Sequence, residues 1–293
     1  MAEFDGAPVS GGEGTVGTWE QAVQWLRSQP DQQDLVRAAY YDDPLLSAAD
    51  RYWRSEEWRA VREFLPPGKG TALDAGAGRG ISSFALAKDG FGVTALEPDP
   101  SAIVGAEAIR SLAREAGLPI GVVQDVSERL PFEDEAFDVV FARAVLHHTA
   151  DLGTACREFH RVLKPGGTLI AIREHVISRP QDLEVFLAQH PLHRRYGGER
   201  AYLLDQYLQA LKQASFHPIT CIAPLQSPIN HAPHSAGDVR REVALKAGAG
   251  PLYRPLHALL GIDRVWHGLQ PVLARLDHRP GRHYSFVCRK PAP

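Results

Sequence analysis

Three glycines and an acidic residue near the middle of the chain have the types and spacing needed to bind a nucleoside. Gly76, Gly78 and Gly80 form a turn directly after an apolar run at residues 70–75, and a helix-forming run follows. Glu97 lies seventeen residues beyond Gly80, at the end of the next strand-like run. Such glycines allow a tight turn and a close approach to a ligand, and the acid can accept both ribose hydroxyls. The pattern therefore predicts a nucleoside-binding β-α-β unit.

Asp74 helps to separate two kinds of nucleoside cofactor. It precedes Gly76 by two residues, where the first strand is expected to end. A carboxylate at this place repels a pyrophosphate but suits a cationic group, such as the amino end of S-adenosylmethionine (SAM). The rival on the same fold, a nicotinamide dehydrogenase, is therefore disfavoured.

Five motifs in sequence order resemble those of the class I SAM-dependent methyltransferases. They are LDAGAGRG at residues 73–80, LEPD at 96–99, QDV at 124–126 with LPF at 130–132, FDVV at 137–140 leading to LHH at 146–148, and LKPGGTL at 163–169. The resemblance covers roughly residues 66–223 and a last strand near the C-terminus. It implies an α/β fold, a Rossmann-like seven-stranded doubly wound sheet, with SAM as cofactor and S-adenosylhomocysteine as product.

Four stretches are expected around this core. Residues 1–17 are expected to be disordered, 18–65 to form an N-terminal helical cap, 66–223 plus 283–293 to form the SAM-binding core, and 224–282 to form a helical insertion. The insertion separates the last two strands and is expected to act as a substrate lid. The strands are expected near 70–75, 92–96, 120–124, 137–142, 167–173, 219–223 and 284–289, and helices at 182–189, 200–214, 238–246, 252–260 and 264–276.

The resemblance assigns a partner to each part of SAM. The backbone of the glycine turn would approach the carboxylate end, Asp74 would orient the ammonium, and Glu97 would bind the ribose. Asp125 would accept the adenine amine beside an apolar wall from Val126. The expected cofactor-binding residues are Asp74, Gly76, Gly78, Gly80, Glu97, Pro98, Asp125, Val126 and Arg143.

Three histidines are the candidate catalytic bases. Methyl transfer needs alignment of the nucleophile with the sulfonium carbon, and a base only where the nucleophile carries a proton. His147 and His148 follow the fourth strand, and His175 is expected to follow the fifth together with Glu174. The His147-His148 pair has a second interpretation, because it recurs in the family as a structural turn beside the cofactor.

A loop at residues 190–199 is the candidate substrate-binding segment. Arginine there could grip a carboxylate or phosphate. The alternative is an ordinary helix end with basic residues and a glycine stop. We expect no metal site, because His190 and His193 have no cysteine and no carboxylate except Glu199 nearby. The expected substrate-binding residues are Glu174, His190, His193, Arg194, Arg195 and Tyr196.

The composition excludes several partners. The net charge of −3 gives no general affinity for nucleic acid, and no apolar run reaches the 18 residues typical of a membrane span. Residues 1–17 lack the basic and apolar regions of a signal peptide, so we expect a cytoplasmic protein. The oligomeric state is left open, a homodimer included.

The expected activity is therefore methyl transfer to an oxygen, or a nitrogen, of a small polar or anionic metabolite. Two alternatives remain: another SAM-dependent reaction on the same scaffold, and a SAM-binding module without catalysis. Methylthioadenosine as the product would indicate another SAM-dependent reaction. Cofactor binding without turnover would indicate the non-catalytic module.

Overall fold

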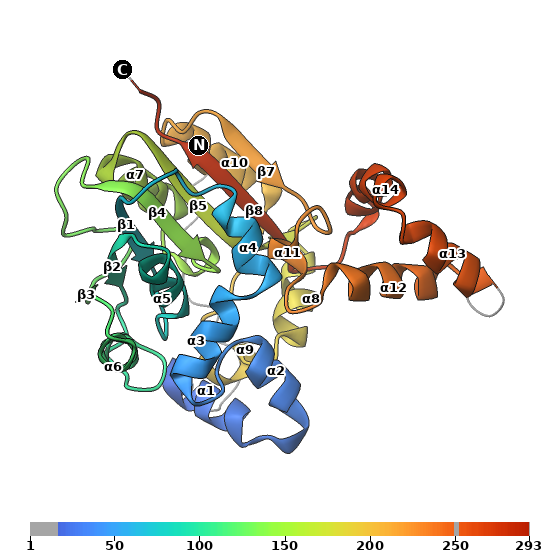
Figure 1. Ribbon diagram of the computed structural model, residues 1–293, viewed down its shortest axis with the longest axis horizontal. Helices are drawn as coiled ribbons and strands as arrows, with labels where there is room; N and C mark the ends of the chain where they lie inside the picture. Colours follow the sequence, from blue (N-terminus) through green and yellow to red (C-terminus); the bar gives the residue numbers. More distant parts are fainter. Residues whose placement is uncertain (1–16, 249–251, 293) are drawn as a thin grey trace.

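A computed structural model describes residues 17–248 and 252–292 and has a mixed sheet of eight strands at its centre (Figure 1). The strand order is β3-β2-β1-β4-β5-β8-β7, and the short β6 pairs with β5. The disorder expected for residues 1–16 lies outside the described residues. The strands are β1 Thr71–Ala75, β2 Gly92–Leu96, β3 Ile120–Val123, β4 Phe137–Arg143, β5 Leu163–Ile177, β6 Tyr202–Leu203, β7 Ile219–Ile222 and β8 Arg282–Arg289.

The central strands are parallel and end together at one edge of the sheet. Ala75 at the end of β1 lies beside Leu96 of β2 and Ala142 of β4. From β1 the chain runs outward to β2 and β3, and it then crosses back to β4 on the other side of β1. Ligands bind outside the carboxyl ends of the strands at such a reversal. The glycine turn, Glu97 and the His147-His148 pair are therefore brought to one edge.

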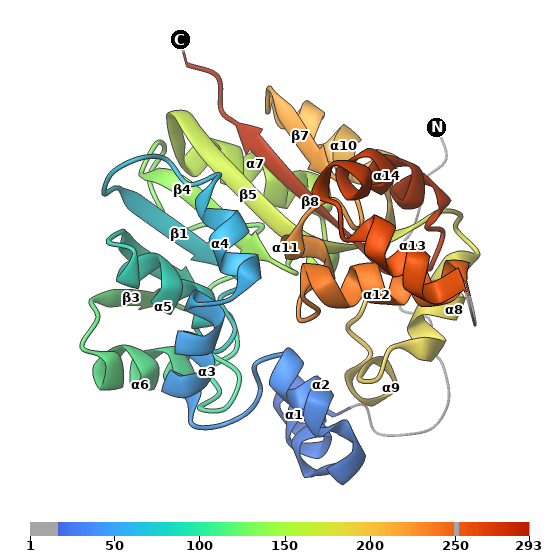
Figure 2. The same ribbon diagram turned by 45° about the vertical axis from the view of Figure 1, so that its right-hand side comes forward.

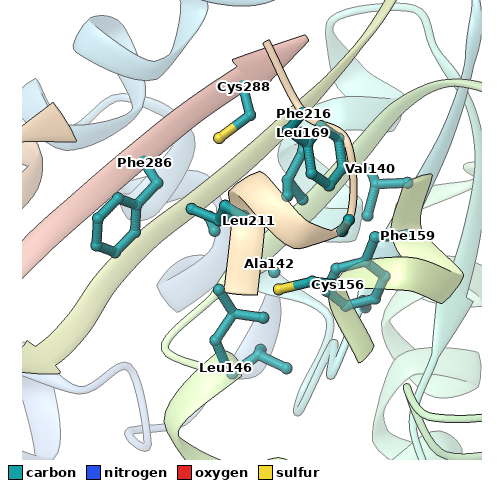
Figure 3. Close-up of a cluster of buried hydrophobic side chains, with 14 of the residues drawn as sticks. Val140, Ala142, Leu146, Cys156, Phe159, Leu169, Leu211, Phe216, Phe286 and Cys288 are labelled. Atoms are coloured by element: carbon teal, nitrogen blue, oxygen red, sulfur yellow. The ribbon is translucent and has the colours of Figure 1, made fainter. Parts of the chain in front are cut away.

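Alternate residues of the central strands form two cores, one on each face of the sheet, as the period of two requires. Val140 and Ala142 face helices α7 (Leu152–Val162) and α10 (Leu204–Gln213), where Leu211 and Phe286 complete the cluster (Figure 3). Val139 and Phe141 face the other way. They meet α3 (Leu45–Trp53), α4 (Glu56–Arg62) and α5 (Ile81–Lys88), while α6 (Ala106–Ala116) lies beside β3.

The fifth strand is much longer than the expected 167–173. Beyond a bulge between Ala171 and Glu174, it continues to pair with β8 as far as Val176. Glu174 and His175 therefore lie within β5, and the expectation that they follow it was wrong. The first residue predicted for the helix at 200–214 was also wrong. Residues Tyr202–Leu203 pair with β5 as strand β6, and α10 begins after them at Leu204.

The N-terminal helices pack beside the segment that follows α8 (Asp182–Gln189). Thr18 and Gln21 form a capping box that begins α1 (Trp19–Ser28), followed by η1 (Pro30–Gln32) and α2 (Gln33–Ala38). The Trp19 ring lies 4.6 Å from the Tyr196 ring of α9 (His193–Tyr196), measured between centroids. Figure 2 shows α1, α2 and α9 together below the sheet.

In the described part of the connection between β7 and β8, residues 223–248 and 252–281, there are four α-helices. They are α11 (Pro228–His231), α12 (Ala236–Ala247), α13 (Tyr253–Leu260) and α14 (Asp263–Leu276). The last three extend away from the sheet to the right in Figure 1. Among the described residues, no helix combines the length and the apolar character that a membrane crossing needs.

Candidate functional site

A cavity of about 480 Å³ lies at the carboxyl ends of β1, β2 and β4. Two chemically different groups of residues line it. The glycine turn and Glu97 form one group, and histidines with Glu199 form the other. Side chains from α1 and α2, including Trp19 and Leu35, line it as well, whereas residues 224–282 contribute none of its described lining. The structure therefore does not support the insertion as the substrate lid.

The glycine turn has the shape of a ligand cradle. Gly76, Gly78 and Gly80 all have positive φ, at 59°, 55° and 85°. A Cβ atom at Gly76 would lie 2.7 Å from Val145 Cγ2, so the turn tolerates no side chain there. A Cβ at Gly78 would meet nothing within 4 Å. The backbone at Gly78 is consequently open to a ligand in the cavity.

Glu97 is 8% exposed and holds this turn in place. Its carboxylate accepts the backbone N–H groups of Gly78, at 2.7 Å, and Asp99, at 3.0 Å. Burial raises the pKa of Glu97 to about 7, although these two donors lower it. A carboxylate can accept about four hydrogen bonds. Two acceptor positions thus remain for a ribose diol.

Asp74 is buried behind the turn and does not line the cavity. Its Oδ2 atom accepts the hydroxyls of Ser82, at 2.7 Å, and Ser83, at 2.5 Å, while Oδ1 is buried without a partner. Burial raises the pKa of Asp74 to about 6. Ser82 does line the cavity, so an ammonium group there would be reached through this hydroxyl. Asp74 would therefore act on the amino end of SAM through Ser82 and not by direct contact.

Two of the other expected cofactor-binding residues are at the cavity. Pro98 and Val126 line it, but Asp125 does not. The Asp125 carboxylate accepts the N–H of Val126, at 2.9 Å, and pairs with Arg129 at 3.2 Å. The structure therefore does not bring Asp125 to the position that the resemblance implied.

Arg143 lines the cavity with its charge already paired. Its guanidinium donates to both carboxylate oxygens of Glu57, at 2.7 and 3.2 Å, and Glu57 is 1% exposed. Glu57 comes from α4, so this ion pair ties the N-terminal helices to the end of β4. Sequence reasoning missed Glu57. The only indication of this role in the sequence was an acidic residue next to Trp58, on a helix that has to bury one face.

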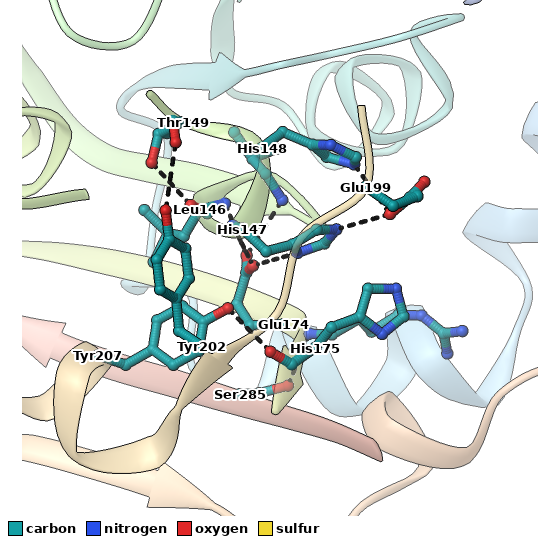
Figure 4. Close-up of polar contacts among 12 residues, drawn as sticks. Leu146, His147, His148, Thr149, Glu174, His175, Glu199, Tyr202, Tyr207 and Ser285 are labelled. Carbon is teal, nitrogen blue, oxygen red and sulfur yellow. Dashed lines mark hydrogen bonds and ion pairs between the residues drawn. The ribbon is translucent and has the colours of Figure 1, made fainter. Parts of the chain in front are cut away.

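Glu174 supports the neighbouring turn and does not line the cavity. It is fully buried, and its carboxylate accepts the N–H groups of Val145 and Leu146, both at 3.1 Å. It also accepts the N–H of His147, at 3.0 Å, and its ring Nδ1–H, at 2.7 Å (Figure 4). Burial raises the pKa of Glu174 to about 7. The expectation that Glu174 binds substrate is not supported, because all its acceptor capacity is used within the fold.

The three candidate bases lie together at the cavity end, as Figure 4 shows. His147 and His175 have ring centroids 4.5 Å apart, and His147 and His148 have centroids 4.2 Å apart. Burial lowers the pKa of His147 well below its usual range and that of His175 to about 3. Both rings are therefore neutral near pH 7. They accept hydrogen bonds there and are weak bases.

The loop at residues 190–199 divides between the cavity and the surface. His190 and Tyr196 line the cavity, whereas His193, Arg194 and Arg195 do not. The Arg195 guanidinium lies over the Trp25 ring, 3.4 Å from its centroid, a cation–π contact that holds α9 against α1. The expected grip of these arginines on an anionic substrate is not supported.

Sequence reasoning also did not place Glu199, or the aromatic residues that line the cavity, among the site residues. Glu199 is 5% exposed and lies beside His147, His148 and His190. The aromatic wall consists of Trp19, Tyr40 and Tyr41. The sequence indicated Glu199 only through its position in a histidine-rich loop. It indicated the aromatic wall only as the apolar face of a helix.

Residues 73–171 match the family model described as a methyltransferase domain, and this match spans the glycine turn, Glu97 and the His147-His148 pair. The chain contains a class I SAM-dependent methyltransferase domain. SAM is the cofactor of this domain.

Two relatives of this methyltransferase domain carry names that describe a substrate or pathway. The chain is 38% identical over 107 residues to a ubiquinone biosynthesis O-methyltransferase of Azorhizobium caulinodans, a match that covers 36% of this chain and 41% of the relative. It is 33% identical over 144 residues to a 2-methyl-6-phytyl-1,4-hydroquinone methyltransferase of Synechocystis, covering 47% of this chain and 43% of the relative. The chain thus spans under half the length of both.

A solved structure agrees with the fold of the methyltransferase domain. A putative methyltransferase of Bacillus halodurans superimposes with a TM-score of 0.53 at 19% identity, covering 81% of this chain and 99% of that one. At this identity the likeness concerns the fold alone.

Proposed function

We propose that this methyltransferase moves the methyl group of SAM to an oxygen of a small molecule with an aromatic ring. The observation that carries the proposal is the lining of the cavity. One group of lining residues is the glycine turn and Glu97, and the other residues combine apolar and aromatic walls with neutral imidazoles. This acceptor differs from the polar or anionic metabolite expected from the sequence, because Arg194 and Arg195 lie outside the cavity.

The part of the cavity that is lined by Trp19, Tyr41 and Tyr196, where we place the acceptor, is suited to a flat ring. The centroids of Trp19 and Tyr41 lie 5.9 Å apart, and those of Trp19 and Tyr196 lie 4.6 Å apart. Leu26 and Leu192 add apolar surface to the same lining. Aromatic pairs of this kind favour a third ring in stacked or edge contact. The names of the two relatives, which refer to ubiquinone and to a hydroquinone, point to the same class of acceptor.

SAM supplies a methyl group that is activated by the positive sulfonium. The acceptor oxygen forms a bond to this carbon while the carbon–sulfur bond breaks, and the bonding pair stays on sulfur. The acceptor hydroxyl loses one proton, which passes to solvent through the hydrogen-bonded imidazole of His147 or His175. The protein's share is to align the oxygen with the carbon and to exclude water, which supplies on the order of 7–11 kcal/mol. Neutral His147 and His175 accept a hydrogen bond from the hydroxyl and orient it.

The test is an acceptor screen with the purified protein, SAM and matched sets of compounds. Phenols, catechols and hydroquinones form one set, and aliphatic hydroxy acids and amines form the other. The proposal expects S-adenosylhomocysteine to form with members of the phenolic set, at least tenfold faster than without an acceptor. Turnover confined to the aliphatic set would refute the proposed acceptor. Methylthioadenosine as the product would refute methyl transfer itself.

A further inference from the structure

Five potential metal ligands, four histidines and one glutamate, meet at the cavity. His147, His148 and Glu199 form one group of ligand atoms that all lie within 4.8 Å of one another, and His175, His190 and Glu199 form a second. They come from three separate parts of the chain: the turn after β4, strand β5 and the loop at residues 190–199. Figure 4 shows His147 and His148 beside Glu199, with His175 on the same side.

Three of these histidines are already oriented as metal ligands usually are. The Nδ1–H of His147 donates to Glu174, at 2.7 Å, that of His175 to the Gly281 carbonyl, at 2.9 Å, and that of His148 to the Gly198 carbonyl, at 3.2 Å. A ring that donates from Nδ1 keeps a lone pair on Nε2. Metal-binding histidines are fixed in this way by a carboxylate or carbonyl behind them. Here all three Nε2 atoms are left to accept.

The surroundings of the Glu199 carboxylate are the observation that indicates a bound ligand. Its Oε2 atom is buried and has no hydrogen-bond partner among residues 17–248 and 252–292, although Nε2 atoms of His147 and His148 each lie 3.9 Å away. Its Oε1 accepts the Tyr196 hydroxyl and lies 3.6 Å from His190 Nε2. These nitrogen–oxygen separations are too long for hydrogen bonds. A buried carboxylate oxygen without a partner is costly, so something else is expected between these atoms.

The separations match two ligands of one ion. Nitrogen and oxygen lie about 2.0–2.2 Å from Zn²⁺, so two ligand atoms of a tetrahedral ion are about 3.4 Å apart and no two can exceed about 4.4 Å. The observed 3.6 and 3.9 Å fall inside this range. Imidazole with one carboxylate is a ligand set for zinc and the neighbouring transition metals, whereas Ca²⁺ and Mg²⁺ prefer oxygen alone.

We propose that Glu199 and the surrounding histidines bind one divalent transition-metal ion of the zinc type, with ligands drawn from His147, His148, His175 and His190. The ion lies in the same cavity as the glycine turn. If the proposed methyl transfer is correct, an open position on the ion binds the acceptor's oxygen. A hydroxyl on such an ion loses its proton near neutral pH, which activates it for attack. The acceptor class is then an oxygen ligand such as a catechol or another chelating phenol.

The first test is metal binding without any substrate. The full-length protein is treated with a chelator, exchanged into clean buffer and titrated calorimetrically with Zn²⁺, and its native metal content is measured by elemental analysis. We expect one Zn²⁺ per chain with a Kd below about 1 μM. Glu199→Gln and His190→Gln should each weaken binding by at least about tenfold, the scale of a lost coordination contact. A matched control is His160→Gln, which removes a histidine of α7 outside both groups and should leave the affinity unchanged.

The outcomes separate this inference from the proposed function. Thermal unfolding and SAM titration of every variant report whether the fold and the cofactor end survive. Co²⁺ substitution gives a second readout, because a four-coordinate tetrahedral Co²⁺ site absorbs visible light far more strongly than hydrated, six-coordinate Co²⁺. Absence of stoichiometric Zn²⁺ binding, or equal binding by Glu199→Gln and wild type, would overturn the site. Methyl transfer that a chelator leaves intact, with Zn²⁺ binding confirmed, would overturn only the role in acceptor activation.

Discussion

Replacement of Glu97 by glutamine isolates the contact between the domain and the ribose of SAM. The carboxylate offers about four acceptor positions, and the N–H groups of Gly78 and Asp99 occupy two of them. Two positions remain for the two ribose hydroxyls. Glutamine keeps one acceptor oxygen and turns an NH₂ group toward these donors. A hydrogen bond to a charged group contributes about 1.5–3 kcal/mol. A net loss of about 2–4 kcal/mol, or roughly a 30- to 700-fold rise in the Kd for SAM, is therefore expected.

The assay is calorimetric titration with SAM at pH 8, where the Glu97 carboxyl, with its pKa raised to about 7, is ionised. Glu128→Gln is the matched control. Glu128 also lines the cavity, but its carboxylate accepts the N–H groups of Ala150 and Asp151, at 2.6 and 3.4 Å. This control should change the Kd less than about threefold, the scale of a contact that contributes little. A Glu97→Gln protein that melts like wild type and binds SAM with less than a fivefold change would refute the ribose assignment.

Three further predictions follow from the site. Burial raises the pKa of Glu97 to about 7, so its protonated form predominates below that pH, and the Kd for SAM should rise by about tenfold per pH unit below 7 while staying level above it. The Glu97→Gln variant should lack this dependence; an equal slope in both proteins would assign it to another group. Glu174→Gln should destabilise the fold by about 3–5 kcal/mol in urea unfolding, because four donors lose a buried carboxylate; a loss below about 1 kcal/mol would contradict its role in holding the turn. Arg195→Ala should leave the Kd for SAM within about twofold, since its guanidinium stacks on Trp25 outside the cavity; loss of SAM binding would place this loop at the cofactor.

The sequence allowed us to predict that the glycine turn and Glu97 lie together, because these residues are close along the chain. Gly76, Gly78 and Glu97 follow two adjacent parallel strands, and parallel strands bring their carboxyl ends to one edge. The strands themselves are apolar runs bounded by turn residues, which is the pattern of a sheet buried on both faces. The registers of β1, β2 and β4 then fix the turn and the acid against each other.

The acceptor end could not be predicted in this way. Glu174 was expected after a strand that ends at 173, but β5 continues to pair with β8 as far as Val176, and the Glu174 carboxylate is buried. Such pairing depends on a strand more than a hundred residues later. The arginine at 195 was placed at the substrate because of its charge, and only the position of Trp25 on α1 shows that it stacks elsewhere.

The histidine cluster could not be predicted from the sequence either, because the fold brings together residues that the sequence did not connect. From the sequence we considered only His190 and His193 as ligands, with Glu199 as the nearest carboxylate, and expected no metal site. The fold moves His193 outside both groups and brings His147, His148 and His175 to Glu199 instead. No local period or motif joins these three segments. Their meeting depends on where β4, β5 and the 190–199 loop end in space.

Parallel calorimetric titrations of the purified protein with SAM, S-adenosylhomocysteine and NAD(H) test the central claim most directly. The glycine turn, the free acceptor positions of Glu97 and the Ser82 hydroxyl held by Asp74 predict micromolar binding of both adenosyl ligands and none of NAD(H). Binding of NAD(H) alone would contradict the account, and so would a folded protein that binds none of the three.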